Sequence, residues 1–438
     1  MKLPEVSEQQ SSVNIECLES PEIPEIPLSV QEIFHLISRT YFQINNDFGN
    51  FNDELLFLVC EVYKESDFYN KNDFKDLVVL SLNFVLGFIK FRCEEMVSVS
   101  EIFSENAENY FFYNYAFLKF MTPLAEKAEV YCFSQRKVSE NEIKTDFKKF
   151  AATLIFDLSR ILFFLRNKDF IYSKSELDTL KDELNYPESV DFFYKADLHL
   201  ELTQKLKNRF YDPIIDSCIS EISFSEEEKF TYLKFLINIF DFKSTQTFLH
   251  TISTACYAYS LGKKVGFDKI GLSELFVAGI LHDIGKMAIP RSVLESRGKL
   301  SSSDFTLMRS HVYFSKKMLS GVVPTNIFKI AIHHHEKIDG SGYPDGLSEQ
   351  DLSTQERILT LVDIFSALAQ SRSYKREYSK EEILKILKDL SDNHQIDSDL
   401  FSVLASNYDS FKKDAEDMKI IFNSPVGQAN LFYEEMLL

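Results

Sequence analysis

The segment from position 250 to position 335 holds six of the nine histidines in this chain. They are His250, His282, His311, His333, His334 and His335. Asp283 directly follows one of them, and Asp363 lies farther along in an otherwise apolar stretch. Imidazole and carboxylate groups together suit transition metals, whereas a lone histidine would more often be an ordinary core or surface residue. The combination therefore predicts a metal centre.

Two motifs sharpen this prediction. Residues 281–286 read Leu-His-Asp-Ile-Gly-Lys, and the histidine run continues at 336–344 as Glu-Lys-Ile-Asp-Gly-Ser-Gly-Tyr-Pro. On these motifs, residues 235–410 resemble the HD-GYP proteins, bacterial phosphodiesterases that open the second messenger cyclic di-GMP. The resemblance implies an all-helical, HD-type, metal-dependent phosphohydrolase domain. Upstream residues resemble no named family.

The resemblance also implies the metal ligands. One ion would be held by His250, His282, Asp283 and Asp363, and a second by Asp283, His311, His334 and His335. Asp283 would bridge, because a carboxylate can bind two cations and an imidazole cannot. The family motif places two ligands directly before Glu336, so His333 is expected to be a spectator or to support a ligand. Glu336 and Asp339 are expected to orient imidazoles by accepting their second N–H.

Three positions depart from the family pattern. Gln246 stands where some members carry a Glu that holds a third metal, so two metals are predicted. Ser253 replaces an Arg of many relatives, and Ser315 replaces a Gly, which bears on fine positioning. Histidine-rich sites accept Fe, Mn, Zn or Ni; iron or manganese is favoured here.

The predicted chemistry is phosphodiester hydrolysis. Two divalent ions about 3.5–4 Å apart can share a hydroxide that is nucleophilic at neutral pH, and their charge stabilises a phosphoryl transition state. The resemblance implies cyclic di-GMP as substrate and linear pGpG as product, with GMP from any further cleavage. Asp283 and Lys286 are the predicted catalytic residues. Lys286 would neutralise the phosphate or protonate the leaving oxygen; a solvated lysine near a helix end is the alternative.

The substrate is an anion, whereas the chain has a formal charge of −19. Metals and a few basic residues must therefore reverse the field locally. By resemblance, Arg372 and Lys375 contact the phosphates, while Gly342, Tyr343 and Pro344 form a loop whose ring stacks on or shapes the guanine pocket. A simple turn and ordinary surface ion pairs stay open as alternatives.

Other functions are also weighed. The same site could cleave another cyclic dinucleotide, or the chain could be a low-activity cyclic-dinucleotide-binding protein that signals to a partner. An iron-dependent oxygenase on the same helical scaffold is disfavoured, because the Gly-Tyr-Pro loop and the basic pair would have no role in it.

A length of 438 residues predicts two domains, since single cores stop growing near about 250–300 residues. The predicted segments are a disordered acidic tail (1–28), an N-terminal regulatory or sensory domain of unknown type (29–225), the HD-GYP domain (226–410) and a C-terminal extension (411–438). The charge argues against a nucleic-acid polymer as partner. A homodimer, or a signalling partner bound through the N-terminal domain, stays open.

Hydrophobic spacing predicts a mainly α fold. It predicts one amphipathic helix over 143–165 and a helix over 226–241, while 129–133 and 198–202 could be short strands. Five successive helices are expected in the C-terminal half. The first holds His250, and the second ends at His282-Asp283. The third begins at a cap formed by Ser301 with Asp304 and carries His311, the fourth ends in the histidine run, and the fifth carries Asp363. Gly285 fits a helix end.

The chain is expected to be cytoplasmic. No apolar run follows the opening residues, and the most apolar window, 77–89, falls short of the roughly 20 residues of a membrane span. The six cysteines have no paired spacing for zinc or a redox dithiol.

Overall fold

The structure is a computed structural model that describes residues 24–92, 95, 98–104, 106–134, 136–296, 298–370, 378–422 and 426–437. Within these residues every regular element is a helix, and the only β-type pairing is an isolated bridge between Asp339 and Ser348. The predicted mainly α fold is confirmed.

The two segments that could have been strands are helical. Residues 129–133 lie in the 3-10 helix η2 (Ala125–Phe133), and 198–202 contain the junction of α9 (Ser189–Leu200) and α10 (Leu202–Lys207). Segments of only five residues are too short for their hydrophobic spacing to distinguish a strand from a helix, which explains the ambiguity.

The described chain divides into two compact units, each treated by itself. The N-terminal unit comprises 29–232 and the last helix, α23 (Val426–Leu437); the C-terminal unit comprises 24–28 and 233–422. The division falls inside α12 (Glu226–Asp241), which spans the residues for which a helix is predicted.

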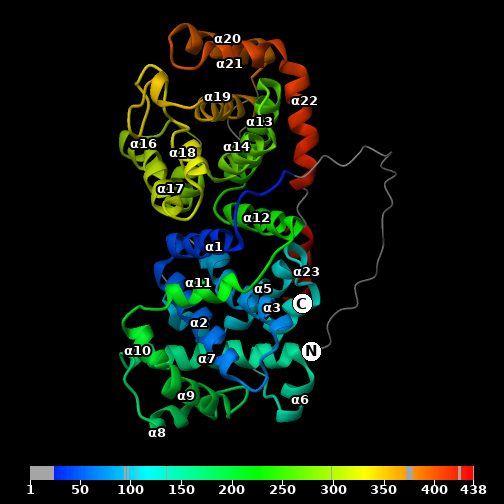
Figure 1. Cartoon of the computed structure of the whole chain (residues 1–438), viewed down its shortest axis with the longest axis vertical. Coiled ribbons are helices and arrows are strands. Elements are labelled where there is room, and N and C mark those ends of the chain that lie inside the picture. Colours follow the sequence, from blue (N-terminus) through cyan, green and yellow to red (C-terminus); the bar gives the residue numbers. More distant parts are fainter. Residues whose placement is uncertain are drawn as a thin grey trace, which may run out of the picture. The chain divides into compact units, whose positions relative to one another are not determined.

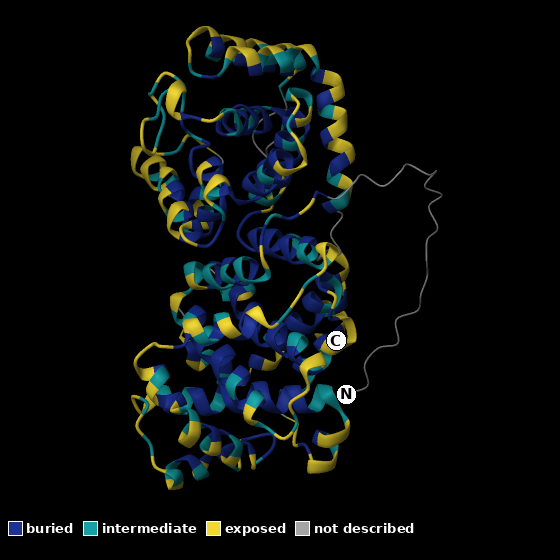
Figure 2. Ribbon diagram, in the orientation of Figure 1, coloured by how far each residue is buried: buried dark blue, intermediate teal, exposed yellow. Residues whose placement is uncertain are grey.

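The N-terminal unit is an assembly of short and medium helices with their apolar faces turned inward (Figures 1 and 2). Besides those already given, its elements are α1 (Val30–Ile44), α2 (Asn46–Glu65), α3 (Lys71–Leu82), α4 (Leu86–Arg92), η1 (Val99–Phe103), α5 (Ala107–Met121), α6 (Glu140–Thr145), α7 (Phe147–Asn167), α8 (Lys174–Leu177), η3 (Asp178–Leu180) and α11 (Asp212–Ser220). Helices α2 and α7 pack on each other, and α23 packs on α5.

The single helix predicted over 143–165 is divided into α6 and α7. The break is at Asp146, whose backbone is extended (φ −133°, ψ 104°) and whose carboxylate accepts the backbone N–H groups two and three residues ahead. Asp is a strong N-cap residue, so it begins a second helix within a continuous apolar pattern.

The C-terminal unit is also helical throughout its described residues (Figure 1). Its elements after α12 are α13 (Thr245–Val265), α14 (Lys269–Leu281), η4 (Ile284–Ala288), α15 (Arg291–Leu294), α16 (Ser302–Arg309), α17 (His311–Leu319), α18 (Thr325–Ile332), η5 (Glu349–Asp351), α19 (Thr354–Ala369), α20 (Lys380–Asp392), α21 (Ser398–Ser406), α22 (Tyr408–Lys419) and η6 (Ile420–Phe422). Helix α13 packs against α14, α19 and α22.

Two local predictions in this unit need correction. Ser301 caps α16 as predicted, accepting the N–H of Asp304 at 3.1 Å, but that helix does not continue through His311. It ends at Ser310, whose hydroxyl donates to the carbonyl of Leu307 at 2.6 Å, and α17 begins one residue later. Side-chain bonds of this kind satisfy the last carbonyls of a helix.

Gly285 does not end a helix in the left-handed conformation; it lies within η4. A Cβ atom at this position would lie 2.0 Å from the carbonyl oxygen of His311 and 2.4 Å from the backbone nitrogen of Ser315. Glycine is therefore needed because η4 and α17 touch backbone to backbone.

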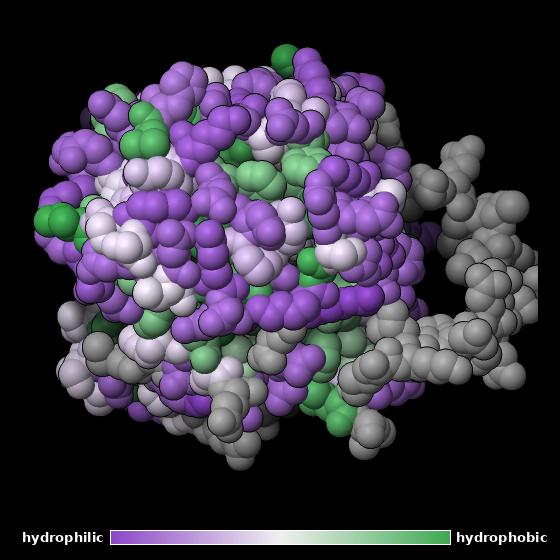
Figure 3. Space-filling view, turned by 90° about the horizontal axis from the view of Figure 1, so that it is seen from below, coloured by the Kyte–Doolittle hydropathy of each residue, from purple (hydrophilic) through white to green (hydrophobic). Residues whose placement is uncertain are grey.

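Nowhere in the described residues does a helix combine the length and the apolar composition needed to cross a bilayer. On the face shown in Figure 3, hydrophilic residues predominate and hydrophobic ones are scattered, in keeping with the net charge of −19.

Candidate metal centre

Three helix ends and two helix interiors bring the predicted ligands together in the C-terminal unit. They are His250 in α13, His282 and Asp283 at the end of α14, His311 at the start of α17, His334 and His335 after α18, and Asp363 in α19. A helix end leaves the chain free to turn, so adjacent residues can present side chains to one point. The structure gathers all the side chains predicted as ligands.

Asp283 lies at the middle of the cluster. Its Oδ2 is 3.1 Å from Nε2 of His282 and 3.7 Å from Nε2 of His250. Its Oδ1 is 3.3 Å from Nε2 of His311 and 3.9 Å from Nε2 of His334. Each oxygen of one carboxylate therefore faces a different pair of imidazoles.

Asp363 completes the first group and approaches the second. Its Oδ1 is 2.9 Å from Nε2 of His250 and 3.7 Å from Nε2 of His282. Its Oδ2 is 3.7 Å from Nδ1 of His335. Ligand atoms of His250, His282 and Asp283 lie within 4.8 Å of one another, as do those of His311, His334 and His335.

Backbone carbonyls orient three of the imidazoles. Nδ1 of His282, His311 and His334 lies 2.6–2.7 Å from the carbonyl oxygen three residues earlier in each case. With Nδ1–H donated to the backbone, Nε2 is the nitrogen left to bind a metal. His250 uses a side chain instead, since its Nδ1 lies 3.2 Å from Oγ of Ser366.

Burial keeps most of these imidazoles neutral. It lowers the pKa of His311 to about 3 and that of His335 to about 4, and it lowers the pKa of His250 and His334 as well. In His282 burial opposes the charge, but the carboxylate of Asp283 outweighs it and raises the pKa. Neutral imidazole is the form that binds metals.

The two carboxyl groups remain ionised. Burial would raise the pKa of Asp283, but His282 and Lys286 outweigh it and hold the pKa well below its ordinary value. In the same way, His250 and His335 overcome the burial of Asp363 and lower its pKa. Two buried carboxylates among imidazole nitrogens form a donor set for divalent cations.

Two atoms in the cluster lack a hydrogen-bond partner although they are buried. These are Nε2 of His282 and Oδ1 of Asp283. Buried polar atoms are nearly always satisfied, so such exceptions call for a specific explanation. Both atoms face other ligand atoms, and the residues therefore fit divalent metal ions.

The substitution at Ser315 is built into the support of the centre. Its hydroxyl accepts the backbone N–H of Gly285 at 2.9 Å and donates to the carbonyl of His282 at 3.0 Å. This serine thus fastens the turn that carries His282 and Asp283. At a second departure, the Ser253 hydroxyl accepts from the Gln370 side-chain amide at 2.7 Å.

Glu336 and Asp339 do not orient imidazoles as predicted. The Glu336 carboxylate accepts backbone N–H groups of residues 345–347 at 2.6–3.1 Å, and Asp339 accepts the N–H and hydroxyl of Ser341 at 2.9 and 2.7 Å. Because Glu336 directly follows His335, the sequence does not distinguish a carboxylate that orients an imidazole from one that binds loop backbone. It fixes the fold of the loop instead.

That loop brings Tyr343 to the centre. Its ring centroid is 4.7 Å from that of His335, and the guanidinium carbon of Arg309 lies 4.1 Å from the centroid of the tyrosine ring. A Cβ atom on Gly342 would lie 2.4 Å from the backbone nitrogen of Lys337, so this close approach requires glycine. The neighbouring Tyr343–Pro344 peptide bond is cis.

His333 lies apart from the other imidazoles of the run. Its Nδ1 contacts the carboxylate of Glu356, and its Nε2 is 3.7 Å from Asp345. Arg372 and Lys375, predicted to bind phosphates, lie outside the described residues.

A cavity of about 400 Å³ reaches the centre at His250 and Lys286. Lys286 also contacts the Asp283 carboxylate through Nζ. Two more lysines of the same cavity, Lys412 and Lys419, come from α22, and Gln246 lines it too. Nothing in the sequence motifs indicated the α22 lysines, because they follow the recognised region.

Comparison with known proteins gives the family of this unit. The family model described as HD domain matches residues 234–400. This match lies within the C-terminal unit and covers less than half of the chain. The predicted resemblance to HD-GYP proteins is confirmed, since relatives of the HD domain are cyclic dinucleotide phosphodiesterases.

The relatives come from several bacteria. The 3'3'-cGAMP-specific phosphodiesterase 1 of Vibrio cholerae is 32% identical over 182 residues, which cover 41% of this chain and 42% of that protein. A cyclic di-GMP phosphodiesterase of Pseudomonas aeruginosa is 33% identical over 141 residues (32% and 34%), and one of Thermotoga maritima is 28% identical over 212 residues (44% and 58%). The chain spans less than two thirds of each relative.

Among solved structures, that of a cyclic GMP-AMP specific phosphodiesterase of V. cholerae is similar over 87% of this chain and 98% of that chain. The TM-score is 0.55 and the sequence identity is 15%. This likeness shows a shared fold alone.

Proposed function

We propose that this chain is a metal-dependent phosphodiesterase that opens a cyclic dinucleotide. One observation carries the proposal: each oxygen of the buried Asp283 carboxylate faces a separate pair of imidazoles. The first ion would be held by His250, His282, Asp283 and Asp363, and the second by Asp283, His311, His334 and His335. Divalent iron or manganese bound here would supply an activated water and offset phosphate charge.

Lys286 is the proposed catalytic residue besides Asp283. Its ammonium group reaches both the Asp283 carboxylate and the cavity, so it can move from its ion pair to a phosphate or to the leaving oxygen. A cationic donor at a site of developing negative charge stabilises the transition state. The proton for the leaving oxygen would come from this group.

The cavity offers more positive charge for the second phosphate of a cyclic dinucleotide. Lys412 and Lys419 line it, although Lys419 also pairs with Glu416 at 2.8 Å. Arg372 and Lys375 are proposed to add to this charge. In the loop, Gly342, Tyr343 and Pro344 are proposed to contact a base, with the Tyr343 ring as the stacking surface.

Cyclic di-GMP is the proposed substrate, with linear pGpG as product and GMP after any further cleavage. Relatives named for cyclic di-GMP support this assignment. The alternative, 3'3'-cGAMP, is supported by the relative of V. cholerae named for that substrate.

Parallel assays of both substrates test the proposal. The purified chain, loaded with Mn²⁺ and assayed for metal, is incubated with cyclic di-GMP or 3'3'-cGAMP, and linear products are followed by chromatography. We expect faster turnover of cyclic di-GMP and none in a folded Asp283→Ala variant. Faster cleavage of 3'3'-cGAMP would reverse the substrate assignment. Binding of either without turnover would indicate the low-activity binding protein instead.

A further inference from the structure

The N-terminal unit contains a cavity of its own, with a volume of about 340 Å³. It is lined by residues of η1, α5, α7 and η3 together with the connections next to them. Ligand pockets usually measure about 300–1,000 Å³, so this one suits a single small molecule rather than a macromolecular segment.

One face of α7 forms much of the wall. The residues on it are Phe156, Ser159, Arg160, Phe163, Phe164 and Asn167. Successive members are alternately three residues and one residue apart, which places them on a single side of the helix. Leu158, Ile161, Leu162 and Leu165 are buried in the core and form a different stripe.

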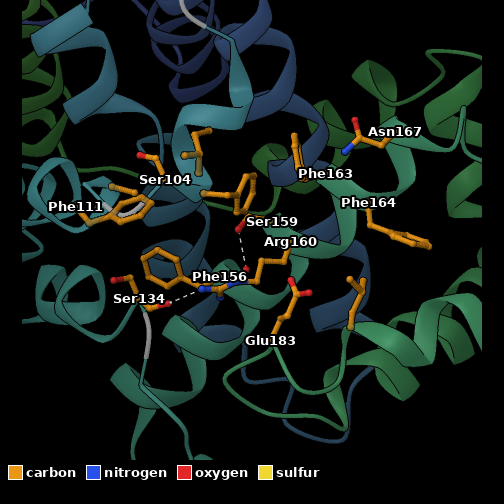
Figure 4. A pocket seen from close by; sticks show the side chains of 14 residues that line it. Ser104, Phe111, Ser134, Phe156, Ser159, Arg160, Phe163, Phe164, Asn167 and Glu183 are labelled. Carbon is orange, nitrogen blue, oxygen red and sulfur yellow. Dashed lines mark hydrogen bonds between the residues drawn. The ribbon is translucent and has the colours of Figure 1, made fainter.

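Aromatic rings supply the apolar part of the cavity. The rings of Phe111 and Phe156 are 4.8 Å apart and nearly perpendicular, and those of Phe103 and Phe163 are 4.6 Å apart and tilted by 31° (Figure 4 shows three of these). Phe111 and Phe156 are buried, whereas Phe103 and Phe163 are half-buried. Such walls favour a flat aromatic guest, whose edge or face can pack on them.

Arg160 supplies a cation that the protein does not fully use. Its Nη2 donates to the carbonyl of Ser134 at 3.3 Å, but its Nη1 is buried without a hydrogen-bond partner (Figure 4). Burial also lowers the pKa of Arg160, against the pull of Asp157 and Glu183. A buried N–H group without an acceptor is costly, so an acceptor on a bound ligand would account for the position of Nη1.

The nearest buried carboxylate is already committed to the protein. Asp157 accepts the backbone N–H groups of Asn185 and Tyr186 at 2.7 and 3.0 Å and the hydroxyl of Ser189 at 2.7 Å. Asp157 attracts the Arg160 guanidinium electrostatically, but no ion pair within 4.0 Å joins the two among the described residues. Asp157 therefore holds the backbone at 185–189, and Nη1 of Arg160 is left without a hydrogen-bond acceptor.

Glu183 places an anion beside this cation. Its side chain is exposed, lines the cavity, and extends toward Arg160 in Figure 4, again with no ion pair between the two among the described residues. The cavity thus has one positive and one negative group next to a set of phenyl rings.

We propose that this cavity binds a free α-amino acid with an aromatic side chain. Its carboxylate would accept from the Arg160 guanidinium, its ammonium group would donate to Glu183, and its ring would pack among Phe111, Phe156 and Phe163. Guanidinium and carboxylate match in shape and charge, which makes this the strongest polar contact of the three. The site would give the N-terminal unit a small-molecule ligand that is independent of the metal centre.

Isothermal titration of the full chain tests the ligand class. The probes are L-phenylalanine, phenylacetate, which lacks the ammonium group, and phenethylamine, which lacks the carboxylate. We expect L-phenylalanine to bind at least tenfold more tightly than phenylacetate and phenethylamine not to bind. Absence of L-phenylalanine binding up to 10 mM, or tighter binding of phenethylamine, would overturn the proposal.

Two variants test the residues. Arg160→Met keeps the apolar stem of the side chain and should lose at least tenfold in affinity for L-phenylalanine; Glu183→Gln should weaken L-phenylalanine but leave phenylacetate unchanged. Arg136→Met and Glu188→Gln, at exposed positions of the same unit, are the matched controls. Thermal unfolding confirms that each variant is folded. Wild-type affinity in Arg160→Met would overturn the assignment.

Discussion

Asp283 is held in place from several sides. Its side chain is 1% exposed, it follows the C-cap residue of α14, and the Ser315 hydroxyl accepts and donates hydrogen bonds in the turn that carries it. The charged form of a carboxyl this deeply buried persists because imidazoles and an ammonium group surround it. A residue so placed has few uses other than to bind cations.

Lys286 is predicted to be needed for the chemical step. Lys286→Ala should lower kcat by about 10²–10³-fold, as is common when one preorganised donor to a transition-state charge is removed. Steady-state hydrolysis of cyclic di-GMP by the Mn²⁺-loaded chain measures it, with Lys385→Ala, an exposed lysine of α20, as control. A kcat within threefold of wild type would remove Lys286 from the mechanism.

The α22 lysines are predicted to bind substrate. Lys412→Ala and Lys419→Ala should each raise KM about tenfold with little change in kcat, because a charge-assisted contact to phosphate contributes about 1.5 kcal/mol or more. Lys413→Ala, the exposed neighbour on the same helix, is the control. Equal KM values in all three variants would show that α22 does not contact the substrate.

Sequence predicted the residues of the centre better than their support. The ligand set came from the resemblance to HD-GYP proteins, and the structure brings those side chains close together. The roles of Ser315 and Glu336 depend on which backbone groups fold against them, and no local pattern carries that information. Lysines such as Lys412 carry no signal either, because lysine is the ordinary choice for a solvated helix face.

At the scale of helices, close backbone contact between η4 and α17 aligns Asp283 with His311. The contact depends on Gly285, where any Cβ atom would overlap the backbone of α17. Helices that meet at this distance tolerate no added atom without moving apart.

Gly285→Ala is therefore predicted to destabilise the C-terminal unit by about 1–3 kcal/mol, the usual cost of overpacking. Thermal unfolding monitored by circular dichroism measures it. Gly298→Ala is the matched control, because nothing lies within 4 Å of the added atom there. A melting temperature equal to that of the control would mean that the two elements are not packed as described.

Helix α2 gives a pH-dependent prediction in the N-terminal unit. Burial raises the pKa of Asp53 to about 7, although hydrogen bonds from the Ser38 hydroxyl oppose the rise. The unfolded carboxyl titrates near about 3.9, so between about pH 4 and pH 7 the folded state binds the extra proton. The free energy of unfolding that the protonated Asp53 contributes is therefore present at low pH and is lost as the pH rises toward 7.

Asp53→Asn removes this titration. We therefore compare the melting temperature of the variant with that of wild type at each pH. The difference, variant minus wild type, should be larger at pH 8 than at pH 5. Asp67→Asn, at an exposed position after α2, is the control. The same difference at both pH values would show that Asp53 does not titrate in this range.

Element boundaries were predictable where caps and apolar spacing agree. Helix 226–241 and the Ser301 cap are examples. The breaks at Asp146 and Ser310 were not, because a polar residue within an apolar pattern starts a new helix only when its side chain bonds to the local backbone.

For the whole molecule, metal binding should contribute to stability. A ligand that binds only the folded state stabilises it by about 4 kcal/mol at a thousandfold excess over its dissociation constant. Treatment with EDTA is therefore expected to lower the melting temperature of the C-terminal unit, and Mn²⁺ in excess of the chelator to restore it. An unchanged melting profile would contradict a structural contribution from metals.

The composition of the chain indicated a two-part helical protein but not what its first part does. A net charge of −19 disfavours binding of polyanions to the surface as a whole, but it does not determine the charge at each cavity. Lys286 and the α22 lysines line one cavity, and Arg160 lines the other. These local groups decide what each unit can bind. Residues from four separate elements line the cavity of the N-terminal unit, so no linear sequence motif predicts it.

The central claim, that one carboxylate serves two metal ions, is tested most directly by metal stoichiometry. Elemental analysis of the chain equilibrated with excess Mn²⁺ and freed of unbound metal should give two ions per chain for wild type and at most one for Asp283→Ala, with the far-ultraviolet circular dichroism of both unchanged. A single ion in wild type, or two ions retained in the variant, would contradict the account.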